Sequence, residues 1–235
     1  MRAIVSTVKL LIFSVWSVTV CLMAMVVYLF TWTHKVPVFF AQRIWTPIVL
    51  LLFGVRLKVE GVENVKPDEH YIIMANHSSF IDIPILFKAL PILQYYVAKK
   101  ELKKVPFLGW FISFSGMIFI DRSNRAKATE SLNKAAVLIN EGRNVVIFPE
   151  GTATRTGEIG EFKKGGFHLA LNSKGTILPV RIEGSRKIWP RGSMFRLSAG
   201  EVKVVINEGI AYDKYHSRSV DDLAIGVRKI IARDN

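Results

Sequence analysis

The sequence predicts an α/β domain, built on a mixed and largely parallel sheet flanked by helices, behind an apolar helical membrane anchor. From residue 56 onward, short apolar runs alternate with helix-like segments, as they do where helices cover a sheet. Before that point, residues 10–33 contain no charged side chain, which is typical of a segment that enters a bilayer. We therefore expect an anchor over residues 1–55 and one α/β domain over residues 56–235.

The anchor contains two apolar runs of different length. A helix over Leu10–Thr33 would be about 36 Å long, enough to cross a hydrocarbon core. The second run, Ile44–Val55, would reach only about 18 Å and is too short to cross. Two topologies therefore remain open: one helix that crosses the membrane, or a helical hairpin that enters only one leaflet. A cleaved signal peptide is the weaker interpretation, because the first run is too long and no A-x-A site follows it.

Charge and cysteine content narrow the choice of partner. The formal net charge is +13, which favours anionic partners such as nucleic acid, anionic lipid or phosphorylated small molecules. With an apolar N-terminus, lipid headgroups and phosphate are the better match, and we expect no nucleic acid. The single cysteine, Cys21, rules out an intrachain disulfide.

The domain is expected to contain seven strands and five helices. The predicted strands are Leu57–Glu60, Tyr71–Ala75, Gln94–Ala98, Met117–Ile120, Val145–Phe148, Ile177–Ile182 and Val202–Ile206. The predicted helices are Ile83–Leu90, Pro106–Phe114, Arg125–Asn140, Phe167–Asn172 and Asp221–Ala232. Pro179 removes a ladder donor from its strand, which must therefore lie at an edge of the sheet or carry a bulge.

The most informative motif is Asn76-His77-Ser78-Ser79-Phe80-Ile81-Asp82, directly after a buried-strand pattern. Histidine can take a proton near neutral pH, and a carboxylate can hold its tautomer and stabilise the resulting cation. On one continuous helix, side chains five residues apart point about 140° away from each other. The chain must therefore turn between His77 and Asp82, with Asp82 at the start of a helix. As a helix N-cap before Pro84, Asp82 would need no catalytic role.

Three further blocks occur at predicted strand ends, where α/β sites form. The first, Gly116–Arg122, is an apolar run that ends in an acid and an arginine. The second, Phe148-Pro149-Glu150-Gly151-Thr152, breaks a strand and presents Glu150 before a flexible glycine. The third is Leu178-Pro179-Val180.

These four blocks, in this order, resemble the glycerolipid acyltransferases of the 1-acylglycerol-3-phosphate acyltransferase type. Residues 76–82 are similar to the N-H-x-x-x-x-D motif, residues 116–122 to G-x-x-F-I-D-R, and residues 148–152 to F-P-E-G-T. Many relatives continue the third block with Arg-Ser. Here Ala153-Thr154 follows and the arginine comes at Arg155, so its contact with substrate is re-registered or supplied by another residue.

The resemblance implies acyl transfer from a thioester to the 2-hydroxyl of 1-acylglycerol-3-phosphate, giving phosphatidic acid. His77 would be the general base and Asp82 would orient it. Arg122 would bind the acceptor phosphate through its guanidinium, unless it only pairs with Asp121 or Glu150.

Several weaker assignments complete the expected site. Glu150 would hydrogen-bond the glycerol or fix a basic neighbour, Gly151 and Thr152 would offer backbone N–H groups, and Arg155 and Lys163 would supply positive charge. Ser78 or Ser79 as an acylated nucleophile is a minor alternative, because the acceptor already brings a hydroxyl.

The expected substrates are a lysophospholipid and an acyl thioester, either acyl-CoA or acyl carrier protein, at the cytoplasmic face of the cell membrane. No cofactor and no metal are expected, because the histidines show no metal-ligand spacing. Another lysolipid or glycerol phosphate as acceptor remains open. Rival classes are a metal-dependent phosphatase or esterase and a non-catalytic lipid-binding membrane protein.

Overall fold

The computed structural model describes residues 2–121, 123–154, 157–193 and 195–233. Within them, a seven-stranded sheet has the order β1-β7-β6-β2-β5-β3-β4, and its neighbouring strands are parallel except β6 and β7. The strands are β1 (Val55–Glu60), β2 (Tyr71–Ala75), β3 (Gln94–Lys99), β4 (Ile118–Ile120), β5 (Asn144–Ile147), β6 (Thr176–Glu183) and β7 (Gly200–Ile206). The predicted mixed, largely parallel sheet is confirmed.

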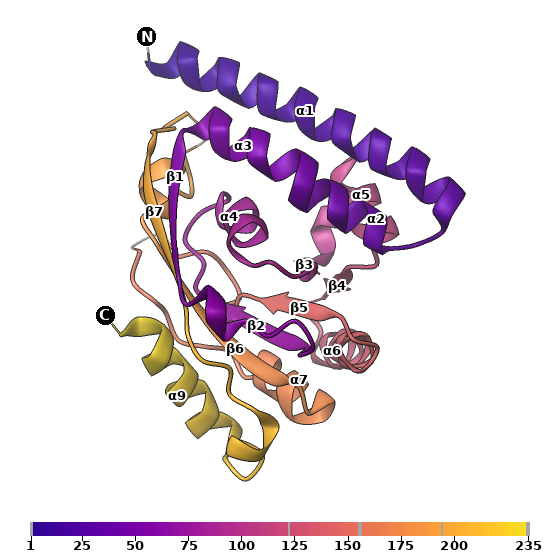
Figure 1. Ribbon diagram of the computed structural model, residues 1–235, viewed down its shortest axis with the longest axis vertical. Coiled ribbons are helices and arrows are strands. Elements are labelled where there is room, and N and C mark those ends of the chain that lie inside the picture. The colour runs from indigo at the N-terminus through magenta and orange to yellow at the C-terminus, as the bar shows by residue number, and fades with distance from the viewer. Residues whose placement is uncertain (1, 122, 155–156, 194, 234–235) are drawn as a thin grey trace.

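Helices cover both faces of this sheet (Figure 1). The α-helices are α1 (Arg2–Thr31), α2 (Lys35–Phe39), α3 (Thr46–Phe53), α4 (Asp82–Ala89), α5 (Leu108–Phe114), α6 (Arg125–Asn140), α7 (Gly165–Ser173), α8 (Ser185–Ile188) and α9 (Val220–Ala232). A π-helical turn, η1 (Phe40–Trp45), joins α2 to α3, and short 3₁₀ turns are η2 (Val62–Asn64), η3 (Lys100–Lys104) and η4 (Tyr212–Lys214). The four-residue helix α8 is absent from the sequence prediction.

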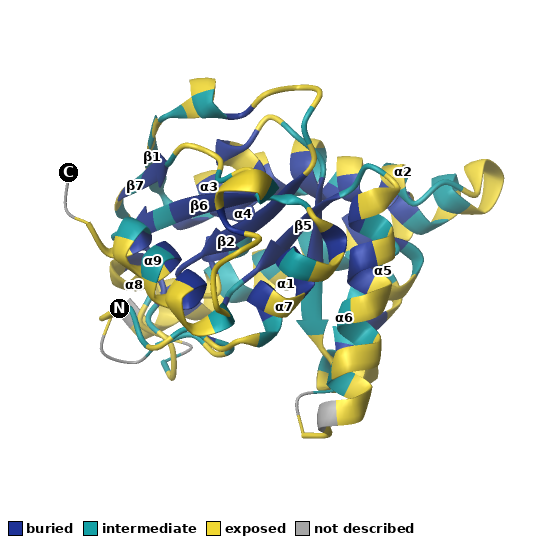
Figure 2. Ribbon diagram, turned by 90° about the horizontal axis from the view of Figure 1, so that it is seen from below, coloured by how far each residue is buried: buried dark blue, intermediate teal, exposed yellow. Residues whose placement is uncertain are grey.

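Alternate residues of the central strands feed two hydrophobic cores. Ile73 and Ala75 face a core formed with α3 and α4, whereas Ile72 and Met74 face one formed with α6, α7 and α9. All five residues of β2 are buried, as expected for a strand of a parallel sheet that helices cover on both faces. Figure 2 shows the buried strands enclosed by helices with exposed outer faces.

The N-terminal helices form an antiparallel pair along one side of the sheet (Figure 1). The indole N–H of Trp45 donates to Ser17 Oγ at 2.9 Å, and the ring of Phe13 lies 5.7 Å from that of Phe53. These contacts fasten α1 to the second helix and to the domain core.

The second N-terminal helix is longer than the predicted run Ile44–Val55. It is helical from Lys35 to Phe53, a length of 19 residues. The prediction that this helix is too short to cross a membrane is therefore wrong. Pro37 lies in its first turn, where the missing N–H has no helical partner to lose. Both N-terminal helices are long and apolar enough to cross a membrane.

Pro179 does not mark an edge strand. β6 lies between β2 and β7, so the edge alternative is wrong. The neighbouring chain is distorted instead: between the pairs Val180–Ile206 and Ile177–Ile210, β6 has two residues and the facing chain has three, so the extra residue lies opposite the strand that contains Pro179. Asn207 donates its N–H to the Pro179 carbonyl at 3.0 Å, so the position without a donor faces a distorted ladder.

Candidate active site

The site begins where β2 ends at the middle of the sheet. The next residue, Asn76, donates its amide to the Ile182 carbonyl at 2.9 Å and accepts the Ile182 N–H at 2.7 Å. This side chain replaces a missing pair of ladder bonds and ties the chain to β6. The following residue, His77, therefore leaves the sheet in a fixed direction.

His77 and Asp82 meet across a tight turn. The distance from His77 Nδ1 to Asp82 Oδ2 is 2.7 Å, and the same oxygen accepts the N–H groups of Ser78 and Ser79 at 2.8 Å each. Asp82 is the first residue of α4 and is fully buried, whereas 19% of the His77 side chain is exposed. The predicted turn, with His77 outside the helix and Asp82 at its start, is confirmed.

This arrangement sets the tautomer of the imidazole. A carboxylate accepts only, so Nδ1 carries the hydrogen toward Asp82, and Nε2 keeps the lone pair of a base. The N-cap position of α4 is Ile81, and the N–H groups that Asp82 accepts belong to Ser78 and Ser79, which precede the helix. The expectation that Asp82 is the helix N-cap is therefore wrong, and its carboxylate holds the turn and the imidazole instead.

Glu150 fixes the other side of the histidine. Its Oε1 accepts the His77 backbone N–H at 2.8 Å, and its Oε2 accepts the Gly160 N–H at 3.0 Å. Burial raises the pKa of this carboxyl group, and the two N–H donors act in the opposite direction. The ring of Phe148 stacks on the imidazole, with centroids 4.0 Å apart. Both oxygens of Glu150 thus hold backbone, so the structure gives it a positioning role.

The remaining predicted residues divide into three groups. The Gly151 N–H donates to the Phe148 carbonyl at 2.9 Å, so the expectation that it is aimed at a phosphate is not met. Lys163 is exposed, and its backbone N–H donates to the Pro149 carbonyl at 2.8 Å. This hydrogen bond keeps Lys163 beside the segment that contains Glu150 and Thr152. Arg122 and Arg155 lie outside the described residues.

An ion pair precedes Arg122 in the second block. Lys100 Nζ lies 2.7 Å from Asp121 Oδ2, and the Ser123 hydroxyl donates to Asp121 Oδ1 at 2.6 Å. The hydrogen bond from Lys100 is the main cause that lowers the pKa of Asp121 to about 2. Asp121 therefore has a cationic partner of its own.

The two serines of the first block make hydrogen bonds that stabilise the fold around the site. Ser79 is fully buried and donates to the Trp189 carbonyl at 2.7 Å, and Ser78 Oγ lies 3.1 Å from Ser185 Oγ. These bonds favour direct transfer over an acyl-serine intermediate. They also bring the segment that contains α8 to the site, which sequence reasoning missed because four residues carry no helical periodicity.

A histidine held by a buried carboxylate at the strand ends of an α/β sheet is an arrangement that can accept and return a proton, which is the chemistry that group transfer and hydrolysis need. In the described part of the chain, no group of three or more His, Cys, Asp or Glu residues is placed to hold a metal ion.

Comparison with known proteins assigns the family. The acyltransferase family model matches residues 56–183, more than half of the chain, so the chain belongs to the acyltransferase family. The resemblance of its four sequence blocks is thereby confirmed.

Curated relatives and a solved structure agree. The chain is 38% identical over 181 residues to 1-acyl-sn-glycerol-3-phosphate acyltransferase of Saccharomyces cerevisiae, covering 73% of this chain and 59% of that protein. It is 32% identical over 157 residues to the enzyme of the same name from Borreliella burgdorferi, covering 67% and 63%. The crystal structure of the 1-acyl-sn-glycerophosphate (LPA) acyltransferase PlsC from Thermotoga maritima superposes with a TM-score of 0.85 at 25% identity, covering 99% of this chain and 95% of that one. The chain spans about half to two thirds of the length of four curated relatives that it matches.

Proposed function

We propose that this protein transfers a fatty acyl group from a thioester to the 2-hydroxyl of 1-acyl-sn-glycerol-3-phosphate, giving phosphatidic acid. The contact of 2.7 Å between His77 Nδ1 and Asp82 Oδ2 carries the proposal, because it prepares a base for a hydroxyl group. The names of the relatives supply the acceptor and the reaction.

In the proposed reaction, His77 Nε2 takes the proton of the acceptor hydroxyl as its oxygen attacks the thioester carbonyl. The carbonyl becomes a tetrahedral oxyanion, and Asp82 stabilises the imidazolium through Nδ1. When the intermediate collapses, the carbon–sulfur bond breaks, the new ester bond remains, and the thiolate takes the proton from His77. Glu150 and Phe148 hold the imidazole in place while its charge changes.

For the acceptor phosphate we propose Arg122, with Thr152, Arg155 and Lys163 as further contacts. The pairing of Asp121 with Lys100 supports this, because it neutralises the acid that precedes Arg122. A guanidinium can then bind the phosphomonoester bidentately. We assign Glu150 to positioning.

We further propose that residues 1–55 anchor the protein in the cell membrane and that residues 56–235 are the catalytic domain, with the site at the cytoplasmic face. The two apolar N-terminal helices support an anchor. The expected donors support the cytoplasmic face, since acyl-CoA and acyl carrier protein are charged and do not cross a bilayer.

The test is to incubate the purified protein with acyl-CoA or acyl carrier protein and a panel of lysolipids plus glycerol phosphate, and to identify products by mass. Phosphatidic acid from the lysophosphatidate reaction is expected. No turnover of any phosphate-bearing acceptor would overturn the proposal. A non-catalytic lipid-binding protein predicts that His77→Ala changes nothing, whereas the proposed enzyme loses acyl transfer and keeps its binding to vesicles.

A further inference from the structure

A second basic site lies beside the His77 turn. A pocket of about 480 Å³ opens between the chain after β6 and the loop that follows Glu150. It is lined by Gly157, Gly184, Arg186, Lys187, Arg196 and Ser198. Three of these side chains are cationic, and none is acidic.

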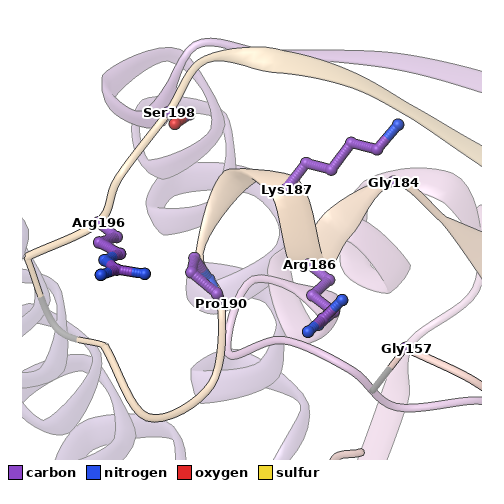
Figure 3. A pocket seen from close by; sticks show the side chains of 7 residues that line it. All are labelled: Gly157, Gly184, Arg186, Lys187, Pro190, Arg196 and Ser198. Carbon is purple, nitrogen blue, oxygen red and sulfur yellow. The ribbon is translucent and has the colours of Figure 1, made fainter. Parts of the chain in front are cut away.

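The three cations are free to bind an anion. Among the residues that the structure describes, no hydrogen bond or ion pair engages the side chains of Arg186, Lys187 or Arg196, and all three are exposed. Figure 3 shows the guanidinium groups of Arg186 and Arg196 on the two sides of Pro190. Like charges held close together without acids raise the local potential, and an anionic ligand would relieve their repulsion.

The pocket is attached to the catalytic turn at several points. Ser185 and Trp189, on either side of the basic pair Arg186-Lys187, bond the side chains of Ser78 and Ser79. Gly157 passes so close to Arg186 that an added Cβ would lie 3.2 Å from its Cδ. A ligand in the pocket is therefore held at a fixed position relative to His77.

The sheet order separates this pocket from the Lys100–Asp121 pair that precedes Arg122, the main residue proposed for the acceptor phosphate. His77 follows the central strand β2; Lys100 and Asp121 lie beyond β3 and β4 at one edge, whereas Arg186 and Arg196 follow β6 and precede β7 on the other side. A transferase that joins two phosphate-bearing substrates needs two anion sites with its base between them. The volume and the spread of three cations also exceed what one phosphomonoester needs.

We propose that this pocket binds the phosphate groups of the acyl-thioester donor, which places the thioester carbonyl at His77 from the side of β6. This inference rests on the proposed acyl transfer. It assigns Arg186 and Arg196 as donor-binding residues, with Lys187 adding to the field.

The experiment compares Arg186→Gln and Arg196→Gln with the control Lys229→Gln, which removes the same charge from α9. Steady-state kinetics are measured with acyl-CoA and acyl carrier protein at saturating lysophosphatidate, and with lysophosphatidate at saturating donor. Loss of a charge-assisted hydrogen bond raises the KM for the donor about tenfold or more, with kcat and the KM for lysophosphatidate within about twofold. Arg186→Lys recovers most of the loss, and Lys229→Gln behaves as wild type.

Three results would overturn the proposal. A raised KM for lysophosphatidate alone assigns the pocket to the acceptor. Normal kinetics on detergent-dispersed substrate with weakened binding to anionic vesicles make it a membrane-surface patch. A normal KM for the donor, a normal KM for lysophosphatidate and normal binding to anionic vesicles would together show that the pocket binds none of these ligands.

Direct binding of coenzyme A, measured by calorimetry, separates this inference from the proposed function. If wild-type protein turns over no lysolipid but binds coenzyme A about tenfold more tightly than Arg186→Gln does, the pocket stands and the acyl transfer fails. If turnover occurs and the donor KM of Arg186→Gln is unchanged, the acyl transfer stands and the pocket assignment fails.

Discussion

His77 owes its orientation to two carboxylates from distant parts of the sequence. Asp82 holds the ring through Nδ1, and Glu150, 73 residues after His77, accepts the backbone N–H of His77. A carboxylate that accepts two or three N–H groups is fixed in place, so the imidazole has a fixed orientation without a bound ligand.

Asp82→Asn is expected to lower kcat by about 10²–10⁴ with little change in either KM. An asparagine at this position can still offer its oxygen to the Ser78, Ser79 and His77 N–H groups, but it carries no charge, so the imidazolium that forms in the reaction loses its stabilising partner. The measurement is steady-state kinetics, with circular dichroism and vesicle binding as controls for folding. Retention of more than about half of wild-type kcat would contradict the assigned role.

The Lys100–Asp121 pair gives a pH-dependent signature. The pKa of Asp121 falls from its ordinary 3.8 to about 2, so the stabilising contribution of the pair is present above pH 3.8 and lost as the pH falls through about 2. Lys100→Met should return the pKa toward 3.8, as followed by the carboxyl carbon resonance of Asp121. An unchanged pKa in that variant would show that Ser123 alone holds the carboxylate.

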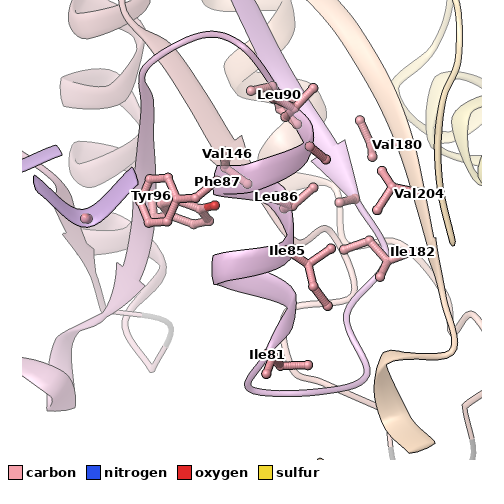
Figure 4. Packing of buried hydrophobic residues seen from close by; sticks show 14 of the residues in the cluster. Ile81, Ile85, Leu86, Phe87, Leu90, Tyr96, Val146, Val180, Ile182 and Val204 are labelled. Carbon is pink, nitrogen blue, oxygen red and sulfur yellow. The ribbon is translucent and has the colours of Figure 1, made fainter. Parts of the chain in front are cut away.

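At the scale of elements, α4 links the core to the site. Its apolar residues pack between the sheet and the N-terminal helices, and Figure 4 shows Ile85 and Leu86 facing Val180 and Ile182 of β6. The same helix begins at Asp82, so its packing sets the height of the carboxylate relative to β2. Stability and site geometry therefore depend on one helix.

Ile85→Ala is expected to lower the free energy of unfolding by about 2–5 kcal/mol, because the side chain is fully buried and leaves a cavity. Lys88→Ala, on the exposed side of the same helix, should change it by less than about 0.5 kcal/mol. Both are measured by urea denaturation in detergent. Equal effects of the two substitutions would mean that α4 is not held by this core.

At the scale of the whole molecule, the N-terminal helix α1 carries large apolar side chains that the described residues leave exposed. Leu11 and Val15 of α1 are exposed at 61% and 67%. The opposite side of the same helix packs on α3 through Phe13. A helix that is apolar on both sides fits a position between a protein core and lipid.

Leu11→Glu combined with Val15→Glu is expected to reduce binding to phospholipid vesicles at least about tenfold, since each charge at depth in a bilayer costs about 2.5–3.5 kcal/mol. Flotation with vesicles measures the bound fraction. His77→Ala is the matched control, with unchanged flotation and no acyl transfer. Full flotation of the doubly charged variant would exclude this face of α1 as the membrane contact.

Much of the fold follows from patterns within short segments. All seven predicted strands are present, and their ends lie within two residues of the predicted ones. Each strand is a short apolar run or an alternation of apolar and polar residues, and both patterns are typical of strands in a sheet covered by helices. The turn between His77 and Asp82 was also predictable, since helix geometry forbids their contact otherwise. Pro179 was predictable only as a distortion, because one proline fits either an edge or a bulge.

The sequence by itself determined the sheet elements, the apolar N-terminus and the residues of the four blocks, because these depend on neighbours along the chain. Only the tertiary structure decided that Glu150 holds the backbone N–H of His77, that β6 lies inside the sheet, and that Arg186 and Arg196 line a pocket beside the His77 turn. Those facts depend on strand order, which brings together residues about a hundred positions apart, such as Ser78 and Ser185. The periodicity of a short segment does not predict the strand order, because the order is set by how the helices pack on the two faces of the sheet.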